Sequence, residues 1–203
     1  MHCMTEAQEP AGESAMAAVG GFFWELIKVV IIAAVIIIPI RYFLVQPFFV
    51  RGASMEPTYS DGEYLIIDQL SYRMRDPRRG EVIVFRFPDN HSQFFIKRII
   101  GLPGETVTIA DGQVSIVNSQ YQQGANLNEA QYLSAELRTG GQLTTTLAED
   151  EYFVLGDNRF SSSDSRSWGA LSRSEIVGRS LLRAFPFNRA EVFDPVSLGF
   201  ISI

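Results

Sequence analysis

The chain has 203 residues, enough for one ordinary domain, and it carries 17 basic and 23 acidic side chains for a net charge of −6. Its single cysteine, Cys3, excludes a disulfide framework and a cysteine–histidine zinc site. Two histidines, His2 and His91, are too few for the clusters of most catalytic metal sites. An acidic chain with scattered arginines lacks the cationic patch that nucleic acid requires, so we expect no nucleic-acid partner. The chemistry must use hydroxyls, carboxylates, arginines or a lysine.

Residues 1–21 are small and polar, and we expect a disordered tail because nothing among them could bury a core. Residues 22–44 are predicted to form a transmembrane anchor. Its apolar part, FFWELIKVVIIAAVIIIPI, has nineteen residues and only two charges, Glu25 and Lys28. Crossing ~30 Å of hydrocarbon takes about 20 helical residues, and the two charges lie one turn apart, where they can pair.

Two alternatives exist for this segment, a buried core helix and a cleaved signal peptide. A signal peptide usually has a cationic start and a shorter apolar run, whereas this start is acidic. A core helix this apolar would need a larger domain around it. Arg41 and Arg51, which follow the helix, bias the charge weakly against export of the next domain, so charge alone leaves the orientation undecided.

Residues 45–203 predict a β-rich domain. Short β-branched or aromatic runs, separated by Gly, Pro or Asp-Gly turns, occur at 63–68, 81–87, 94–100, 105–110, 113–118 and 151–156. No long run has a helical period. We therefore predict a mainly β fold, an antiparallel sheet or a barrel-like domain. The stretch 119–149, rich in Gln, Asn, Thr and Gly, is interpreted as an insertion.

The first segment with candidate chemistry surrounds Ser54, which lies in a turn between two strand-like runs. Gly52 lets another backbone come close, and Pro57 fixes the direction of the turn. A hydroxyl in such a turn can be exposed yet rigidly placed, as a nucleophile must be. An ordinary polar turn explains the same residues, and this segment alone does not decide between them.

The second segment contains Lys97, embedded in the run FFIKRII. The chain has only two lysines, and the other, Lys28, belongs to the anchor. On a strand, Lys97 shares a face with Phe95 and Ile99, and burial there would lower its pKa and let it act as a base. The adjacent arginine cannot deprotonate. The alternative is an edge lysine that reaches solvent.

The third segment, LGDNRFSSSDSRSWGAL at 155–171, opens with a turn signal and crowds serines, an aspartate and an arginine together. A calcium-binding EF-hand loop does not fit, because the sixth position from Asp157 is Ser162 and the twelfth is Trp168. A solvated serine-rich linker fits poorly beside a strand.

Together and in this order, the three segments resemble type I signal peptidases, membrane-anchored serine endopeptidases that remove signal peptides from exported proteins. The resemblance covers about 150 residues and the preceding anchor. It rests on the blocks Ser54-Met55 with Pro57-Thr58, Lys97-Arg98 followed by IGLPG, and GDNR with Ser162, Asp164-Ser165-Arg166 and Trp168-Gly169.

The resemblance implies a Ser/Lys dyad, with Ser54 as nucleophile and Lys97 as a general base kept neutral by burial. Ser162 matches the serine that orients the lysine amine, and Asp164 with Arg166 matches the pair that braces the third block. Some relatives have an oxyanion-stabilising serine at the position that is Gly52 here. This departure leaves the Ser54 backbone N–H as the main expected donor.

By the same resemblance, the partners are the lipid bilayer and the signal peptides of exported preproteins, cut after small residues. A signal peptide would add as a strand beside the catalytic sheet. Met55, Phe95 and Ile96 flank the dyad and are candidate walls of the substrate pocket. The resemblance implies no metal and no cofactor, and it places the catalytic domain on the exported side of the cell membrane.

Two other classes of protein share part of this pattern. One is a self-cleaving Ser/Lys regulator of DNA-damage responses, which would need a binding head in place of the apolar helix. The other is a membrane-tethered binding module without activity, which predicts that Ser54 and Lys97 can be replaced without consequence. His91, in a polar turn, is interpreted as a surface residue rather than a member of a catalytic triad.

Overall fold

The structure is a computed structural model that describes residues 11–39, 45–134, 136–196 and 198–201. The chain divides into two units, Met1–Phe43 and Leu44–Ile203.

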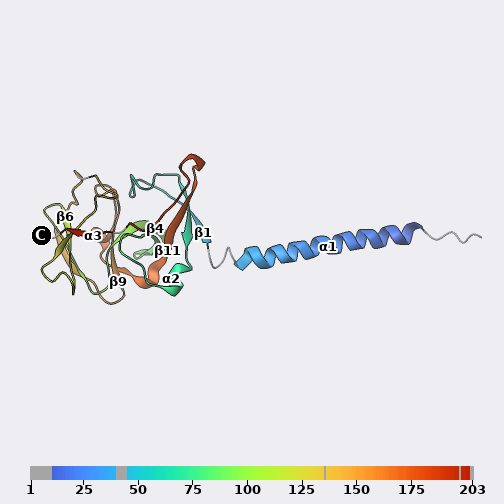
Figure 1. The fold of residues 1–203 in the computed structure, drawn as a ribbon, viewed down its shortest axis with the longest axis horizontal. Coiled ribbons are helices and arrows are strands. Elements are labelled where there is room, and N and C mark those ends of the chain that lie inside the picture. The colour runs from blue at the N-terminus through green and yellow to red at the C-terminus, as the bar shows by residue number, and fades with distance from the viewer. Residues whose placement is uncertain (1–10, 40–44, 135, 197, 202–203) are drawn as a thin grey trace, which may run out of the picture. The chain divides into compact units, whose positions relative to one another are not determined.

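The first unit contains one long helix, α1 (Ala11–Pro39), drawn in blue in Figure 1. The helix begins at Ala11, so residues 11–21, predicted to be disordered, are helical. Alanine, glutamate and methionine in this stretch favour helix, and lengthening an existing helix needs no new nucleus. Residues 1–10 of the predicted tail and 40–44 of the predicted anchor lie outside the described residues.

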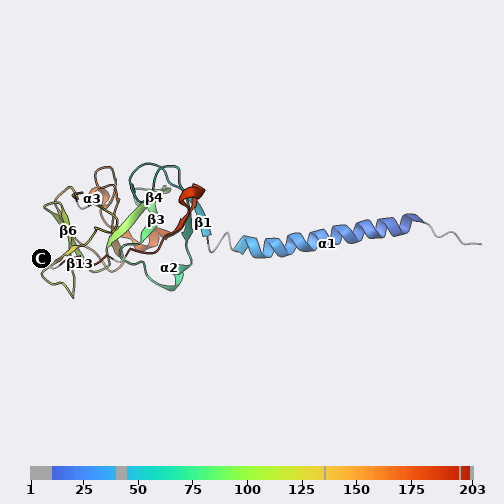
Figure 2. The ribbon, with the colours of Figure 1, turned by 45° about the horizontal axis from the view of Figure 1, so that its top comes forward.

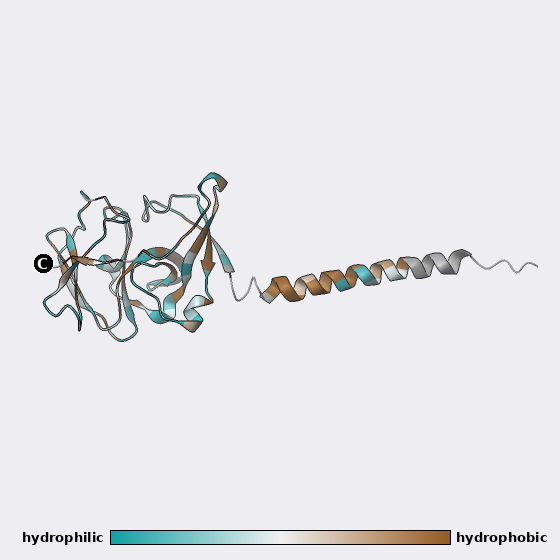
Figure 3. Ribbon diagram, in the orientation of Figure 1, coloured by the Kyte–Doolittle hydropathy of each residue, from teal (hydrophilic) through white to brown (hydrophobic). Residues whose placement is uncertain are grey.

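Helix α1 is long and apolar enough to cross a membrane. Its most apolar part, Val19–Ile38, spans 20 residues with a mean hydropathy of 2.4, and none of it is buried. Figure 3 shows the apolar residues concentrated toward the C-terminal end of the helix. The two charges form an ion pair, with Lys28 Nζ 2.6 Å from Glu25 Oε1. A helix that is apolar on all sides needs lipid or a protein core around it.

The second unit consists of two antiparallel sheets and agrees with the predicted mainly β fold. The larger, eight-stranded sheet has the order β1-β2-β11-β3-β4-β9-β10, with β12 paired to β11. Its strands are β1 (Val45–Phe49), β2 (Tyr64–Asp68), β3 (Val82–Phe87), β4 (Asn90–Gly101), β9 (Glu151–Leu155), β10 (Leu171–Ser172), β11 (Ile176–Phe185) and β12 (Glu191–Val192).

The smaller sheet has five strands in the order β13-β7-β6-β5-β8. They are β5 (Thr106–Ala110), β6 (Gln113–Val117), β7 (Ala125–Leu127), β8 (Leu143–Thr146) and β13 (Phe200–Ile201). Short helical turns, α2 (Ser71–Met74), α3 (Ser165–Trp168), η2 (Arg173–Glu175) and η3 (Phe187–Arg189), join the strands. In the described part of the chain neither sheet closes, so the fold is a pair of open sheets and not a barrel.

The stretch 119–149, interpreted as an insertion, supplies strands β7 and β8 to the smaller sheet. Its polar composition is consistent with β8, which alternates between half-buried and exposed residues. The residues that do face inward, such as Leu127 and Leu147, join the core with Phe153 of β9. The segment is therefore part of the fold.

The central strands are apolar on both faces because they separate different core clusters. On β9, Phe153 and Leu155 belong to a core cluster that they share with residues of the smaller sheet. Tyr152 and Val154 belong to a second core cluster, which they share with residues of β3. Successive side chains on a strand point to opposite faces, so such a strand is a continuous hydrophobic run. Strand β3 and the second half of β4, adjacent in Figure 2 and paired with each other, are buried in the same way.

Candidate active site

Strand β4 carries Lys97 at the point where its pairing changes. On one side β4 pairs with β3 from Asn90 to Arg98. On the other side β9 pairs only from Arg98 onward, with Leu155 opposite Arg98. In the part of the chain that is described, β4 therefore has an unpaired edge before Arg98, and Lys97 is the last residue of that edge.

The turn that carries Ser54 is fixed by Asn158. The Asn158 N–H donates to the Ser54 carbonyl at 3.1 Å, and its side-chain amide donates to the Ala53 carbonyl at 3.1 Å. Within the turn, the Glu56 N–H donates to the Ala53 carbonyl at 3.2 Å, and the Met55 side chain is fully buried. These contacts hold the backbone at Ser54 in one place, as expected for a positioned hydroxyl.

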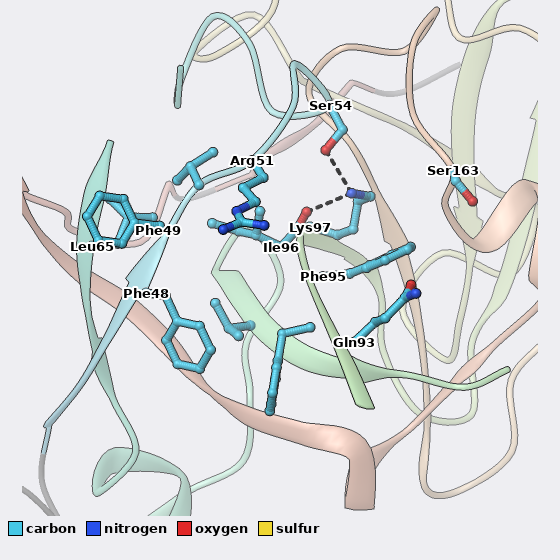
Figure 4. A pocket seen from close by; sticks show the side chains of 13 residues that line it. Phe48, Phe49, Arg51, Ser54, Leu65, Gln93, Phe95, Ile96, Lys97 and Ser163 are labelled. Atoms are coloured by element: carbon cyan, nitrogen blue, oxygen red, sulfur yellow. Dashed lines mark hydrogen bonds between the residues drawn. The ribbon is translucent and has the colours of Figure 1, made fainter. Parts of the chain in front are cut away.

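The structure brings Ser54 and Lys97 together. Their Oγ and Nζ atoms are 2.9 Å apart, and Nζ also donates to the carbonyl of Ile96 at 2.8 Å (Figure 4). A neutral amine that donates one N–H to Ile96 keeps a lone pair that can accept the Ser54 proton. This distance is within the range that proton transfer between a nucleophile and its base requires.

The surroundings of Lys97 favour the neutral amine. Its side chain is nearly inaccessible to water, at 3% exposed. Burial lowers the pKa of Lys97 from 10.5 to about 8, although the Asp164 and Asp157 carboxylates favour the cation and oppose the shift. At pH 8 about half of the amines are therefore neutral, compared with well under a hundredth for an unperturbed lysine. The edge-lysine alternative is excluded by this burial.

Ser162 lies beside the Ser54 turn but makes no hydrogen bond to Lys97. A Cβ placed on Gly156 would be 2.2 Å from Ser162 Oγ and 2.4 Å from the Ser54 carbonyl oxygen, so the three residues are in close contact. The Ser162 hydroxyl is buried and lies beside the Asp164 carboxylate, whose pKa it helps to lower, but it makes no hydrogen bond of regular geometry among the residues that the structure describes. A buried hydroxyl without a partner costs about 1–3 kcal/mol.

Asp164 and Arg166 form a buried ion pair next to this hydroxyl. Arg166 Nε and Nη2 each lie 2.8 Å from a carboxylate oxygen of Asp164, and the Gly156 N–H donates to the same carboxylate at 3.1 Å. Burial raises the pKa of Asp164, but the Arg166 and Gly156 hydrogen bonds outweigh it, so the pKa lies below its ordinary value. Because Gly156 directly follows β9, the pair attaches the third block to the strand beside β4.

A second buried ion pair was missed in the sequence. Arg98 donates to Asp157 through Nε at 2.8 Å and Nη2 at 2.6 Å, and Thr58 Oγ1 donates to the same carboxylate at 2.6 Å. Arg98 also donates to the Gly80 carbonyl at 2.8 Å. The pair joins β4, the segment after Ser54 and the third block. A buried arginine needs a carboxylate, so Arg98 beside Lys97 was the available signal.

Asn158 was also missed, although its place in a Gly-Asp-Asn turn after a strand pointed to a structural role.

Asp157 and Asp164 each form an ion pair with an arginine. Within the described ranges, no group of three His, Cys, Asp or Glu side chains is arranged to hold a metal ion.

A cavity of about 530 Å³ lies beside the dyad. It is open to solvent, and aromatic and aliphatic side chains form most of its wall (Figure 4). The lining residues are Phe48, Phe49, Val50, Arg51, Ser54, Leu65, Val84, Gln93, Phe94, Phe95, Ile96, Lys97 and Ser163.

The three predicted pocket residues lie in different places. Phe95 and Ile96 line the cavity. Met55 does not line it, because it is 0% exposed and packs in the core with Tyr59 and Leu65. A residue directly after the Ser54 position faces the opposite side of the turn, and here that side is the protein interior.

Donors for an oxyanion are limited around Ser54. The Gly52 N–H is occupied, since it donates to Asp61 Oδ1 at 2.6 Å, and Gly52 has a positive φ of 85° that other residues rarely adopt. The Ser54 N–H has no acceptor among the described residues. It is therefore free to donate to a bound carbonyl oxygen.

Comparison with known proteins agrees with this geometry. A family model described as signal peptidase, peptidase S26, matches residues 23–185. The chain is 39% identical over 170 residues to the protein named "Probable signal peptidase I-2" of Synechocystis sp., covering 81% of this chain and 74% of that one. It is 35% identical over 189 residues to signal peptidase I of Bacillus amyloliquefaciens, covering 91% and 97%. A crystal structure of a signal peptidase I from Enterococcus faecalis aligns with a TM-score of 0.42 at 33% identity, covering 52% of this chain and 97% of that one.

The family match and the similarity to these relatives over most of the chain define a peptidase, and helix α1 is compatible with membrane anchoring. The chain belongs to the signal peptidase family, peptidase S26.

Proposed function

We propose that the protein is a single-pass membrane endopeptidase that removes signal peptides from exported preproteins, with Ser54 as nucleophile and neutral Lys97 as general base. The observation that carries the proposal is the 2.9 Å distance from Ser54 Oγ to a lysine amine whose pKa is lowered to about 8. A hydroxyl is a weak nucleophile unless a base removes its proton, and Lys97 is the base within reach.

In the proposed reaction, the Lys97 amine accepts the Ser54 proton as Oγ bonds to the carbonyl carbon of the scissile peptide. The Ser54 N–H stabilises the resulting oxyanion. The protonated amine then gives its proton to the leaving nitrogen, and the C–N bond breaks to leave an acyl-enzyme. Lys97, again neutral, takes a proton from water as the water oxygen attacks the ester carbonyl. The bond from the carbonyl carbon to Ser54 Oγ then breaks, and Lys97 returns the proton to Oγ, which releases the signal peptide with a carboxylate terminus.

Two supporting roles follow in this proposal. Ser162, whose buried Oγ makes no hydrogen bond of regular geometry, orients the lysine amine once substrate displaces one of the present contacts of that amine. Asp164 and Arg166 hold the third block against β9, which keeps Ser162 and Gly156 next to Ser54. Asp157 and Arg98 hold the segment after Ser54 to β4, the strand that supplies the base.

The substrate is proposed to bind as an added strand along the unpaired edge of β4. An extended peptide there would bond through its backbone to residues before Arg98, and its alternate side chains would enter the cavity. Phe95 and Ile96 would then restrict the cavity near the dyad to small side chains. The signal peptide that the cleavage removes is membrane-bound. We therefore place the second unit on the exported side, with α1 as its anchor.

The test is cleavage of a preprotein by the full-length protein in detergent micelles. Ser54→Ala and Lys97→Met should each lower kcat by about 10⁴-fold or more, since both groups act in the same step. Lys97→Arg keeps the charge but cannot lose its proton, and it should be equally inactive.

The matched control is Ser174→Ala, an exposed serine outside the cavity, which should cleave like the wild type. Circular dichroism and thermal unfolding should show every variant folded. Undiminished cleavage by the Ser54 or Lys97 variants would contradict the proposed dyad.

A further inference from the structure

Arg51 is a cation in the wall of the active-site cavity that the proposed reaction does not use. It is exposed, it lines the cavity with Ser54 and Lys97, and Figure 4 shows its guanidinium directed into that space. Among the described residues Arg51 forms no ion pair, whereas Arg98, Arg159, Arg166 and Arg183 are each paired with a carboxylate.

The backbone around Arg51 is held on both sides. Val50 is 4% exposed, its N–H donates to the Glu63 carbonyl at 2.9 Å, and its own carbonyl accepts from Gly62 at 3.0 Å. On the other side the Gly52 N–H donates to Asp61 Oδ1 at 2.6 Å. The Arg51 side chain therefore starts from a fixed point three residues before the nucleophile and extends from there along the wall of the cavity.

The cavity differs in charge from the rest of the molecule. Its lining contains two ionisable side chains, Arg51 and Lys97, and no carboxylate. Lys97 is neutral in the active form, which leaves the single positive charge of Arg51. The chain as a whole has a net charge of −6, so the positive charge in the cavity is opposite in sign to that of the whole chain.

We propose that Arg51 determines specificity, by favouring preproteins that carry a carboxylate within two residues of the scissile bond. This inference rests on the proposed function and adds a charge requirement to it. A guanidinium offers paired N–H donors that match a carboxylate, and an unpaired one has no competing partner to displace. In the proposed function a small residue directly precedes the cut, so the acidic residue would occupy the second position before the cut or the first two after it.

The experiment compares peptides that differ at one of these three positions. Each peptide carries Asp, Asn or Lys there, and kcat/KM is measured for the full-length protein in neutral detergent. At one position or more, wild type should cleave the Asp peptide about two- to fivefold faster than the Asn peptide, and the Lys peptide more slowly than both. The preference should shrink from about 0.01 M to about 1 M salt, because salt screens exposed charges.

Variants assign the preference to Arg51. Arg51→Gln should cleave the Asp and Asn peptides equally, and Arg51→Glu should prefer the Lys peptide. The matched control Arg78→Gln removes an exposed arginine outside the active-site cavity, and it should keep the wild-type preference.

Two failures can be told apart. If no peptide is cleaved, the proposed function itself is wrong. If all peptides are cleaved but Asp, Asn and Lys are equivalent at every position, or if Arg51→Gln keeps the preference, then the peptidase stands and the role of Arg51 is overturned.

Discussion

At the residue scale, the environments of the Ser54 and Ser162 hydroxyls and of the Lys97 amine explain the site. The Ser54 carbonyl accepts a hydrogen bond from the Asn158 N–H, and the core of the larger sheet shields Lys97 from water. Ser162 is the unusual group, because its buried Oγ lies beside the Asp164 carboxylate but makes no hydrogen bond of regular geometry in the described structure. Proteins rarely bury an unpaired hydroxyl without a use for it.

Ser162→Ala should therefore separate activity from stability. Removing an unpartnered hydroxyl should leave the free energy of unfolding unchanged or raise it by about 1 kcal/mol. If the hydroxyl orients the Lys97 amine, kcat should fall by about 10²-fold with little change in KM. Cleavage kinetics and denaturant unfolding of the same preparation measure both quantities.

Ser165→Ala is the matched control for Ser162. The Ser165 hydroxyl is buried and accepts from the Val154 N–H at 3.0 Å, so its removal leaves that donor unpaired. This variant should lose about 1–3 kcal/mol of stability and keep kcat. The proposed role of Ser162 fails if its alanine variant loses stability and keeps kcat in the same way.

At the element scale, the catalytic strand must also fit against the smaller sheet. Gly101, the last residue of β4, lies where the two sheets meet. A Cβ there would be 2.5 Å from Val107 Cγ2, 2.8 Å from Leu147 Cδ1 and 2.9 Å from Phe153 Cβ. The strand that carries Lys97 can therefore cross the core only with glycine at this position.

Gly101→Ala should destabilise the protein by about 1–3 kcal/mol, as overpacking of a filled core does. The Gly140→Ala control has no atom within 4 Å of the added Cβ and no positive φ, and it should be neutral or slightly stabilising. Thermal unfolding of both variants in detergent measures the difference. Equal stability of Gly101→Ala and wild type would show that the sheets meet differently.

Sequence patterns identified the elements better than their boundaries. Apolar runs located β3, the second half of β4 and β9 because buried residues lie on both faces of these segments. The polar strand β8 was missed, since one side of it faces solvent, and α1 extends further toward the N-terminus than its apolar pattern indicated. Lys97 could be predicted because an isolated lysine in an apolar strand needs an explanation. The partner of Arg98 could not, since Asp157 is brought to it by the pairing of β4 with β9.

At the scale of the whole molecule, a buried lysine couples stability to pH. The folded pKa of Lys97 is about 8 and the unfolded value is 10.5, so the unfolded state binds the proton more tightly. The cost of burying the cation is therefore present in full below pH 8. It falls as the pH rises from 8 to 10.5 and is absent above that range.

Lys97→Met should consequently be more stable than wild type below pH 8, by up to about 3 kcal/mol. The two proteins should converge as the pH approaches 10.5. Denaturant unfolding of the full-length proteins across this range checks the prediction, and the difference between them removes the contribution of other titrating groups. A difference that does not change with pH would mean that Lys97 is not shifted.

The central claim is that a neutral Lys97 activates Ser54, and the pH dependence of acylation tests it most directly. Single-turnover cleavage of a preprotein by the full-length protein should accelerate with pH through one ionisation near 8, because only the neutral amine can accept the Ser54 proton. The rate should rise about tenfold per pH unit well below this value and level off above it. A rate that is flat from about pH 5 to 9 would contradict the account.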